Sequence, residues 1–380
     1  MFNNKLVHKD RDIESLNILR GLLATGILAY HLYWLPVGFG QAIMEGFFAL
    51  SGFLVTKSLF SSRPDNQWNI NIQDACWFWF RRIKRLGLAL WIFILISMLV
   101  CALMPGKWIS GWGLVVGLSS PIWISNIATI HANSSVEPFG GLWSLAIEEQ
   151  FYLILPLLIL FMSKIFKLNV EKRTIIVPLS LICLISLAFR ISALVTSVPI
   201  AFEAYSAQYR MLGFSMGCIG YCLLRTEGTI KHWLKSGGEF IGYVLPLLIF
   251  ITFCGLAFTV DSYSNKTFLI QWLIAPILTT VMCMVLFTYD PKSSGSSKKI
   301  TAGFAYIGKT SYSMYLYHPL VIYLLSVKKM SGALLAFVIS LILGVVSYEL
   351  VEKRLNKMIF RRQNFYFVLK LLKREKEVIT

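Results

Sequence analysis

The chain has 380 residues, of which 56% are hydrophobic and 14% are charged, and its mean hydropathy is +0.66. This composition excludes an ordinary soluble domain, because a soluble core of this size cannot bury so much apolar surface. The net charge of +17 is spread between apolar runs. We therefore expect it to reflect membrane topology and contact with anionic membrane lipids, and we expect no nucleic-acid partner.

Apolar segments long enough to cross a bilayer recur along the whole chain, since a spanning helix takes about 20 residues. Ten such segments are predicted, at 15–36, 40–58, 86–104, 142–163, 174–194, 206–224, 239–260, 268–288, 305–326 and 332–353. An eleventh stretch, 109–131, is interrupted by serines, a proline and an asparagine, and we expect it to lie on the outer side or to be re-entrant. The sequence thus predicts an all-α, polytopic membrane bundle of about ten transmembrane helices.

The orientation of the bundle follows from the positive-inside rule. With the N-terminus inside, 29 of the 36 Lys and Arg residues fall on inner segments and 4 on outer loops. Both termini are therefore expected in the cytoplasm, with a transmembrane domain over 1–356. Residues 357–380 are basic and amphipathic, and we predict that they lie on the inner membrane surface. The polar first fourteen residues predict no cleavable signal.

The first span carries two ionisable residues, which are costly within a membrane and are therefore functional candidates. Arg20 and His31 are eleven residues apart, which places them on one helix face and about 16.5 Å apart along the axis. Arg20 is expected in the inner half of the membrane and His31 in the outer half. The alternatives are that Arg20 extends to the inner headgroups and that His31 only makes a helix contact.

The second span contains a carboxylate and two small residues. Glu45 is expected at about the depth of His31, where it either pairs with the imidazole or faces water at the membrane surface. Ser51 and Gly52 permit close approach of another helix. We therefore predict either a packing notch or part of a binding site at this point.

A basic cluster stands at the inner mouth of the third span, in WFWFRRIKRLGL. Arg81, Arg82 and Arg85 are expected either to anchor the helix at the membrane surface or to bind a phosphorylated ligand. The second interpretation rests on the bidentate contacts that guanidinium groups make with phosphate.

Two adjacent carboxylates, Glu148 and Glu149, open the helix in GGLWSLAIEEQFYLILP. Counted from the outer end of this span, Glu148 is expected at the depth of His31. A carboxylate that reaches a histidine in a dry site makes a general base near neutral pH. The alternative is that both carboxylates face the outer water.

Later spans add further polar side chains. His318 precedes Pro319, and one interpretation is that it fills hydrogen bonds freed by the proline. Arg190, Glu203 and Arg210 are expected to gather at the outer rim, where they would meet a polar acceptor.

Two other groups are expected to be structural. Glu352 is predicted to form an inner-surface ion pair with Lys353 and Arg354. The seven cysteines show no pairing pattern, and no third ligand lies near Cys218 and Cys222. We therefore expect neither a disulfide framework nor a metal site.

Six of these features occur in the order seen in the acyltransferase-3 family of membrane acyltransferases, which the chain resembles over about residues 13–356. They are Arg20-x10-His31, GFFALSGFL, the Arg81-Arg82-x-x-Arg85 cluster, WSLAIEEQFY, SYSMYLYHP and SYELVEK. The chain departs from the family pattern at Glu45, where members usually have aspartate, and at Ile43, where they usually have glycine.

The resemblance implies transfer of an acyl group, often acetyl from cytoplasmic acyl-CoA, to sugars of surface polysaccharides. It also implies that Arg20 and His31 are the functional pair, that the arginine cluster handles the donor and that Glu148 is the glutamate of the tryptophan-serine-leucine motif. Some members carry a C-terminal hydrolase-like domain. This chain stops at Thr380 without one, so we expect the membrane part to complete the transfer.

We therefore predict an O-acetyltransferase of the bacterial inner membrane that acts on a glycan such as lipopolysaccharide O-antigen, with acetyl-CoA as donor and no permanently bound cofactor or metal. The predicted catalytic residues are His31 as general base, with Glu148, Glu45 and Arg20. Donor contacts are predicted for Arg81, Arg82, Arg85 and Ser51, and acceptor contacts for Trp143, Arg210 and His318.

Three alternatives remain open. A transporter of an anionic or lipid-linked solute would also need buried charges, but inverted repeats and broken helices typical of that class are not evident in the sequence. A succinyltransferase acting on an exopolysaccharide or periplasmic glucan would share the acyltransfer chemistry. A non-catalytic assembly scaffold would tolerate the replacement of His31.

Overall fold

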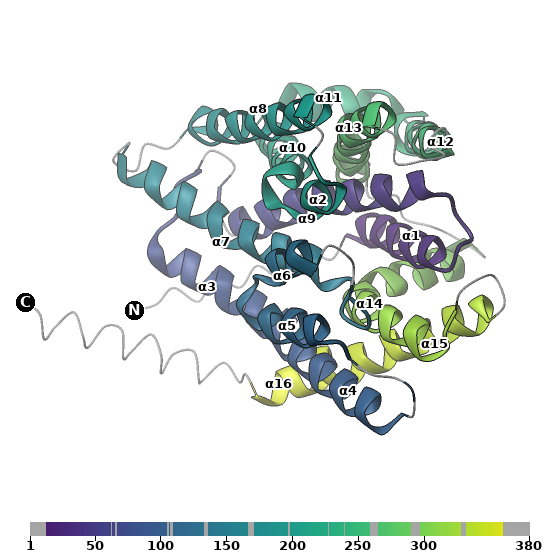
Figure 1. Ribbon diagram of the computed structural model, residues 1–380. Helices are drawn as coiled ribbons and strands as arrows, with labels where there is room; N and C mark the ends of the chain where they lie inside the picture. The colour runs from purple at the N-terminus through teal and green to yellow at the C-terminus, as the bar shows by residue number, and fades with distance from the viewer. Residues whose placement is uncertain are drawn as a thin grey trace, which may run out of the picture.

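The computed structural model describes residues 13–61, 63–64, 67–104, 106, 109–132, 136–165, 171–196, 198–226, 228–238, 240–258, 265–289, 297–327 and 332–359 (Figure 1). Within these ranges the structure is helical and contains no β-strand. The predicted all-α polytopic fold is confirmed. The predicted amphipathic surface segment lies almost entirely outside the described residues.

Ten long helical segments match the ten predicted spans. They are α1 (Glu14–His31), α2 (Val37–Phe60), α3 (Ile72–Arg82) continued by η2 (Ile83–Gly87) and α4 (Leu88–Leu103), α7 (Leu142–Ile165), α8 (Lys172–Thr196), α10 (Ala207–Thr226), η4 (Phe240–Val244) with α12 (Leu245–Phe258), α13 (Asn265–Tyr289), α14 (Ser297–Leu324), and α15 (Ala333–Ser347) with η5 (Tyr348–Leu355) and α16 (Asn356–Ile359). By length and composition alone, six of the helices in the described chain qualify as membrane spans. The cytoplasmic location of both termini stays a prediction.

The interrupted stretch 109–131 does not form an eleventh span. It folds into α5 (Gly111–Ser119), a single 3-10 turn η3 (Ser120–Ile122) and α6 (Ser125–Ala132), and helices of this length are too short to cross a bilayer. The Ser125 hydroxyl donates to the Leu142 carbonyl at 3.0 Å, and the Gln150 side-chain amide donates to the Trp123 carbonyl at 2.7 Å. The stretch therefore packs along the first turns of α7, which favours the re-entrant alternative.

Helix α2 lies at the centre of the bundle, in contact with α1, α10 and α13 (Figure 1). Glycine permits its tightest contact, that with α10. A Cβ atom at Gly52 would collide with the Phe214 carbonyl, and one at Gly217 would collide with the Ala49 carbonyl. The prediction that Gly52 allows close helix approach is therefore confirmed.

Helices α1 and α14 are also in close contact, again through glycine. A Cβ atom at Gly21 would collide with the Phe304 carbonyl, and one at Gly308 with the Asn17 carbonyl. This contact brings the candidate residues of the first span against those of the ninth.

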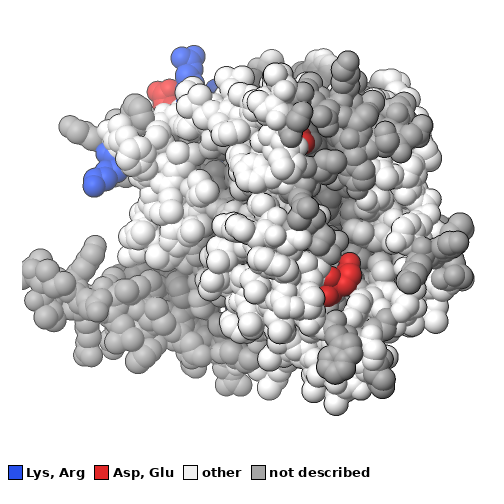
Figure 2. Space-filling view, in the orientation of Figure 1, with Lys and Arg blue, Asp and Glu red and all other residues white. Residues whose placement is uncertain are grey.

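The exterior of the bundle is strongly apolar. Leu95, Leu99 and Leu103 on α4 are each at least 59% exposed, and so are Val177 and Leu184 on α8. The face shown in Figure 2 carries few charged side chains among the described residues. An exterior of this kind is compatible with hydrocarbon surroundings and would aggregate in water.

Candidate functional site

Two histidines from distant parts of the sequence meet inside the bundle. His31 is the last residue of α1, and His318 lies in α14. The Nδ1 atom of His31 is 3.2 Å from the Nε2 atom of His318, and the two ring centroids are 4.9 Å apart. The Nδ1 atom of His318 lies 2.8 Å from the Tyr315 carbonyl oxygen. His31 therefore has a hydrogen-bond partner, but it is not one of the carboxylates that the sequence suggested.

Glu148 lies away from His31, near Arg20. It accepts hydrogen bonds from the Ser51 hydroxyl at 2.8 Å and the Tyr152 hydroxyl at 3.3 Å. It also lines one cavity together with Arg20 and Arg82. The predicted common depth of Glu148 and His31 is therefore wrong.

The depth estimate failed because α7 begins inside the bundle. The Tyr315 hydroxyl lies 2.7 Å from the Ser144 hydroxyl and donates to the Gly141 carbonyl at 3.2 Å. The first turn of α7 thus sits level with Tyr315, one turn short of His318. Seven residues further along, at about 1.5 Å each, Glu148 reaches the level of Arg20.

Glu45 is also separated from His31, because two arginines hold it. Its Oε1 atom is 3.0 Å from Arg190 and 2.7 Å from Arg210, and all three side chains are at most 1% exposed. Arg210 also donates to the Gln41 side chain and the Ala204 carbonyl. The predicted contact of Glu45 with the imidazole is therefore wrong.

The same arrangement places Arg190 and Arg210 inside the bundle, although the sequence suggested the outer rim. The guanidinium of Arg210 lies 5.6 Å from the ring centroid of Trp143. Glu203, in the short helix α9 (Ile200–Tyr205), faces this cluster; burial raises the pKa of its carboxyl, and Arg210 and Arg190 oppose that rise. The acceptor-binding role of Trp143 and Arg210 stays a prediction.

The arginine cluster lines a cavity of about 290 Å³ at the end of α1 opposite His31. Five cationic side chains line it: Arg20, Lys57, Arg81, Arg82 and Arg85. The Arg82 guanidinium is stacked 4.6 Å from the Tyr152 ring centroid, which holds it in place. We name this space the inner cavity. Its size and charge suit a ligand with several phosphates.

A second space, the central cavity, continues from the inner cavity toward the histidines. It shares Arg20, Arg82 and Arg85 with the inner cavity and ends at Ser144 and Tyr315. Tyr315 thus joins the two features, because it lines the central cavity and its carbonyl contacts His318; neither histidine lines any of the three cavities. The spacing of Arg20 and His31 predicted that the site extends along α1 from one residue toward the other. The structure shows which side chains lie between them.

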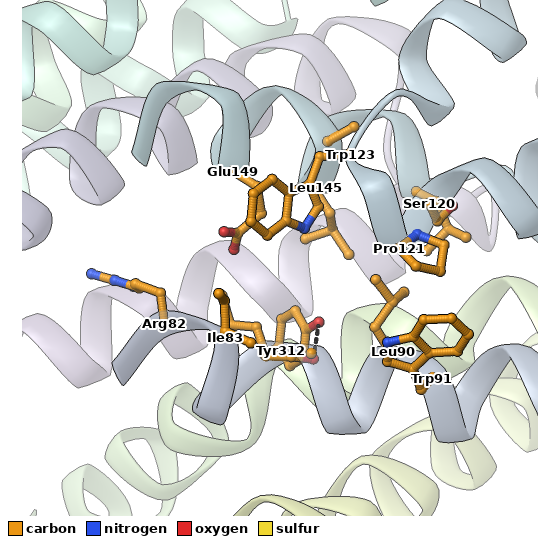
Figure 3. A pocket seen from close by; sticks show the side chains of 14 residues that line it. Arg82, Ile83, Leu90, Trp91, Ser120, Pro121, Trp123, Leu145, Glu149 and Tyr312 are labelled. Carbon is orange, nitrogen blue, oxygen red and sulfur yellow. Dashed lines mark hydrogen bonds between the residues drawn. The ribbon is translucent and has the colours of Figure 1, made fainter. Parts of the chain in front are cut away.

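A third cavity, of about 250 Å³, branches off beside η2 (Figure 3). Arg82, Leu86, Leu145 and Tyr312 belong to both this side cavity and the central cavity. Glu149 is 9% exposed and lies at the same end of the side cavity as Arg82 in Figure 3. The alternative that both adjacent carboxylates face the outer water is therefore wrong.

The π-helical turns η2 and η5 bring in contacts that sequence reasoning missed. The Tyr312 hydroxyl donates to the Leu86 carbonyl in η2 at 2.9 Å. In η5, Glu352 accepts from the Ser313 hydroxyl at 2.6 Å, whereas Glu349 forms the ion pair with Lys353 at 2.9 Å. The sequence assigned the ion pair with Lys353 to Glu352, whereas the structure gives it to Glu349.

Comparisons with known proteins show the family of the chain. The family model described as an acyltransferase domain, Acyl_transf_3, matches residues 13–348. The chain belongs to the acyltransferase-3 family. It is 26% identical over 374 residues to the O-acetyltransferase OatA of Staphylococcus aureus strain NCTC 8325, covering 93% of this chain and 59% of OatA.

The chain is also 26% identical over 383 residues to "Putative peptidoglycan O-acetyltransferase YrhL" of Bacillus subtilis, and the match covers 92% of this chain and 56% of YrhL. The chain thus spans less than three fifths of the length of these relatives. No solved structure matches it.

Proposed function

We propose that this acyltransferase moves an acyl group, acetyl in the first instance, from cytoplasmic acyl-CoA to a hydroxyl group of a cell-surface glycan. The observation that carries the proposal is a pair of cavities that share Arg20, Arg82 and Arg85 and extend from five cationic side chains to Ser144 and Tyr315, whose carbonyl contacts His318 of the histidine pair. A donor with an anionic head and a narrow reactive arm fits such a path.

The donor would bind with its phosphates in the inner cavity, on Arg81, Arg82 and Arg85, and with its pantetheine arm in the central cavity. Ser51 and Glu148 would then line the arm, since their mutual hydrogen bond forms part of the cavity wall. Arg20 belongs to both cavities and would contact the donor where it passes from one to the other.

The chemistry at the far end of the path is proton removal and acyl transfer. Neutral His31 takes the proton of the acceptor hydroxyl, and the hydroxyl oxygen attacks the thioester carbonyl carbon. The carbon–sulfur bond breaks, the ester forms on the glycan, and the CoA thiolate leaves with the proton that His31 took, which returns His31 to its neutral form. A covalent acyl-histidine is the variant in which His31 attacks the thioester itself.

The acceptor is proposed as a class. Lipopolysaccharide O-antigen of a bacterial inner-membrane pathway is one acceptor of this class, and the name of the relative YrhL points to peptidoglycan as another. Both present sugar hydroxyls on the outer side of the membrane, where the predicted orientation places His31. Succinyl is the alternative acyl group.

The function is tested with the purified chain in proteoliposomes, supplied with acetyl-CoA or succinyl-CoA and with either O-polysaccharide or a peptidoglycan disaccharide. We expect release of CoA and a mass gain of one acyl group on one of the two glycans by mass spectrometry. Absence of any mass gain, together with movement of labelled acyl-CoA into the vesicles, would favour the transporter instead.

Replacing Arg82 with Gln is expected to weaken CoA binding by roughly 10- to 100-fold, because a charge-assisted hydrogen bond to phosphate contributes about 1.5–3 kcal/mol. Titration calorimetry with CoA measures this change. Lys84→Gln, in the same helical segment but outside the lining of the three cavities, is the matched control. Equal affinities of the two variants would contradict the placement of the donor phosphates.

A further inference from the structure

We infer that His318 is the positioning residue of the base and determines which nitrogen of His31 is free to take a proton. The inference rests on the proposed role of His31. It replaces the expectation that His318 contacts the acceptor. The groups that carry it are the Tyr315 carbonyl, the two imidazoles and Pro319.

The Tyr315 carbonyl lacks its usual hydrogen-bond donor within the helix. In an α-helix the carbonyl of residue 315 accepts from the N–H of residue 319. Residue 319 is proline, which has no N–H. The carbonyl is left without its usual donor, and the His318 side chain folds back to fill the position, with Nδ1 at 2.8 Å. The His-Pro pair thus fixes the ring of His318.

The second step assigns the hydrogens. A carbonyl only accepts, so the Nδ1 atom of His318 carries a hydrogen. His318 is 2% exposed, and burial without a carboxylate in hydrogen-bond contact favours the neutral ring. A neutral imidazole has one N–H, which leaves a lone pair on its Nε2 atom. That lone pair faces the Nδ1 atom of His31 at 3.2 Å.

The third step follows for His31. Its Nδ1 atom must donate to His318, so its own Nε2 atom carries the free lone pair. Were His318 cationic or in the other tautomer, its Nε2–H would donate to His31, and the Nε2 atom of His31 would hold a hydrogen and could not act as base. His318 therefore favours the reactive tautomer of His31, whose ring also bonds to the Ile27 carbonyl one helical turn earlier.

The same bond stabilises the protonated base. When His31 takes the acceptor proton on Nε2, its Nδ1–H continues to donate to His318, and the bond becomes charge-assisted. A neutral imidazole here performs the orienting task that a carboxylate performs in other catalytic groups of this type. Glu148 and Glu45 are not needed for it.

The test combines nuclear magnetic resonance with kinetics. In the wild-type chain, labelled with ¹⁵N-histidine and placed in nanodiscs, we expect His31 to show a protonated Nδ1 and an unprotonated Nε2, with assignment by His31→Gln. In His318→Phe the population of the Nδ1–H form should fall. With acetyl-CoA, kcat should fall on the order of 10²–10⁴-fold while KM changes by less than about 3-fold.

Two further variants separate positioning from folding. His318→Gln offers an amide oxygen to His31 and should retain more activity than His318→Phe. Pro319→Ala keeps both histidines but restores an N–H that competes for the Tyr315 carbonyl, and should mix the tautomers of His31 and lower kcat.

Three results would overturn the inference. They are a protonated Nε2 on wild-type His31, an unchanged kcat in His318→Phe, and equal activity of the Phe and Gln variants. A different result would refute the proposed function instead. In that case the wild-type chain shows the expected tautomer of His31 but transfers no acyl group to either glycan, and the histidine pair then has no catalytic role.

Discussion

His31→Gln is expected to reduce acyl transfer by roughly 10²–10⁴-fold, the contribution of a positioned general base. Glutamine keeps the polarity and approximate size of the side chain but cannot take a proton at neutral pH. The binding of CoA should remain unchanged, because the inner cavity lies three helical turns away at Arg20. Single-turnover transfer from acetyl-CoA in proteoliposomes measures the first effect, and calorimetry measures the second.

The matched control for this change is His131→Gln. His131 is exposed in α6 and its Nδ1 atom bonds to the Ile127 carbonyl within its own helix. We expect this variant to transfer at the wild-type rate. Full transfer by His31→Gln would rule out His31 as the base even if the chain is an active acyltransferase.

Glu45→Gln is expected to destabilise the folded bundle by about 3–5 kcal/mol, the usual cost of leaving a buried charge without its partner. Arg190 and Arg210 both depend on this carboxylate, at 3.0 and 2.7 Å, and both are 1% exposed. Removing the negative charge leaves two guanidinium groups facing each other away from water. Thermal unfolding in detergent, followed by light scattering and tryptophan fluorescence, measures the loss.

A double variant tests this explanation. In Glu45→Gln with Arg190→Met, one of the two uncompensated charges is gone, and part of the stability should return. Glu349→Gln, which breaks the exposed pair with Lys353, should leave the melting temperature unchanged, because exposed ion pairs contribute little. If Glu45→Gln melts like the wild type, the triad has no structural role.

Hydropathy and charge placement predicted most of the architecture. The ten predicted spans correspond to long helical segments because each is a mostly apolar run. Residues 109–131 form short helices because serine, proline and asparagine interrupt the run. The inner cavity was also accessible from sequence. Arg82 and Arg85 are one turn apart at a helix end, and Arg20 enters from the same predicted side of the membrane.

The partners of the carboxylates could not be predicted in this way. Glu45 meets arginines that are 145 and 165 residues away in the chain, and no local pattern encodes such a contact. The error in the depth of Glu148 has a different cause. A count of residues from the membrane surface assumes that the helix begins there, whereas the first turn of α7 packs against Tyr315 inside the bundle.

The contact between His31 and His318 could be predicted from the sequence only in part. The separation of 287 positions between His31 and His318 hides the contact, but the His-Pro sequence indicates it, because a proline frees the carbonyl four residues earlier. A histidine one residue before a proline within a span can fill that position, and it then presents its other nitrogen to a neighbouring helix.

The way in which the hydrogen-bond chain ends has a consequence for the energy balance of the cell. Linked imidazoles conduct protons readily, and a line of them through a membrane protein would dissipate the proton gradient. Here the hydrogen-bond chain runs from His31 to His318 and ends at the Tyr315 backbone carbonyl, which has no hydrogen to donate. The proton that His31 takes from the acceptor therefore cannot pass along this chain, and it stays on His31 until the CoA thiolate takes it.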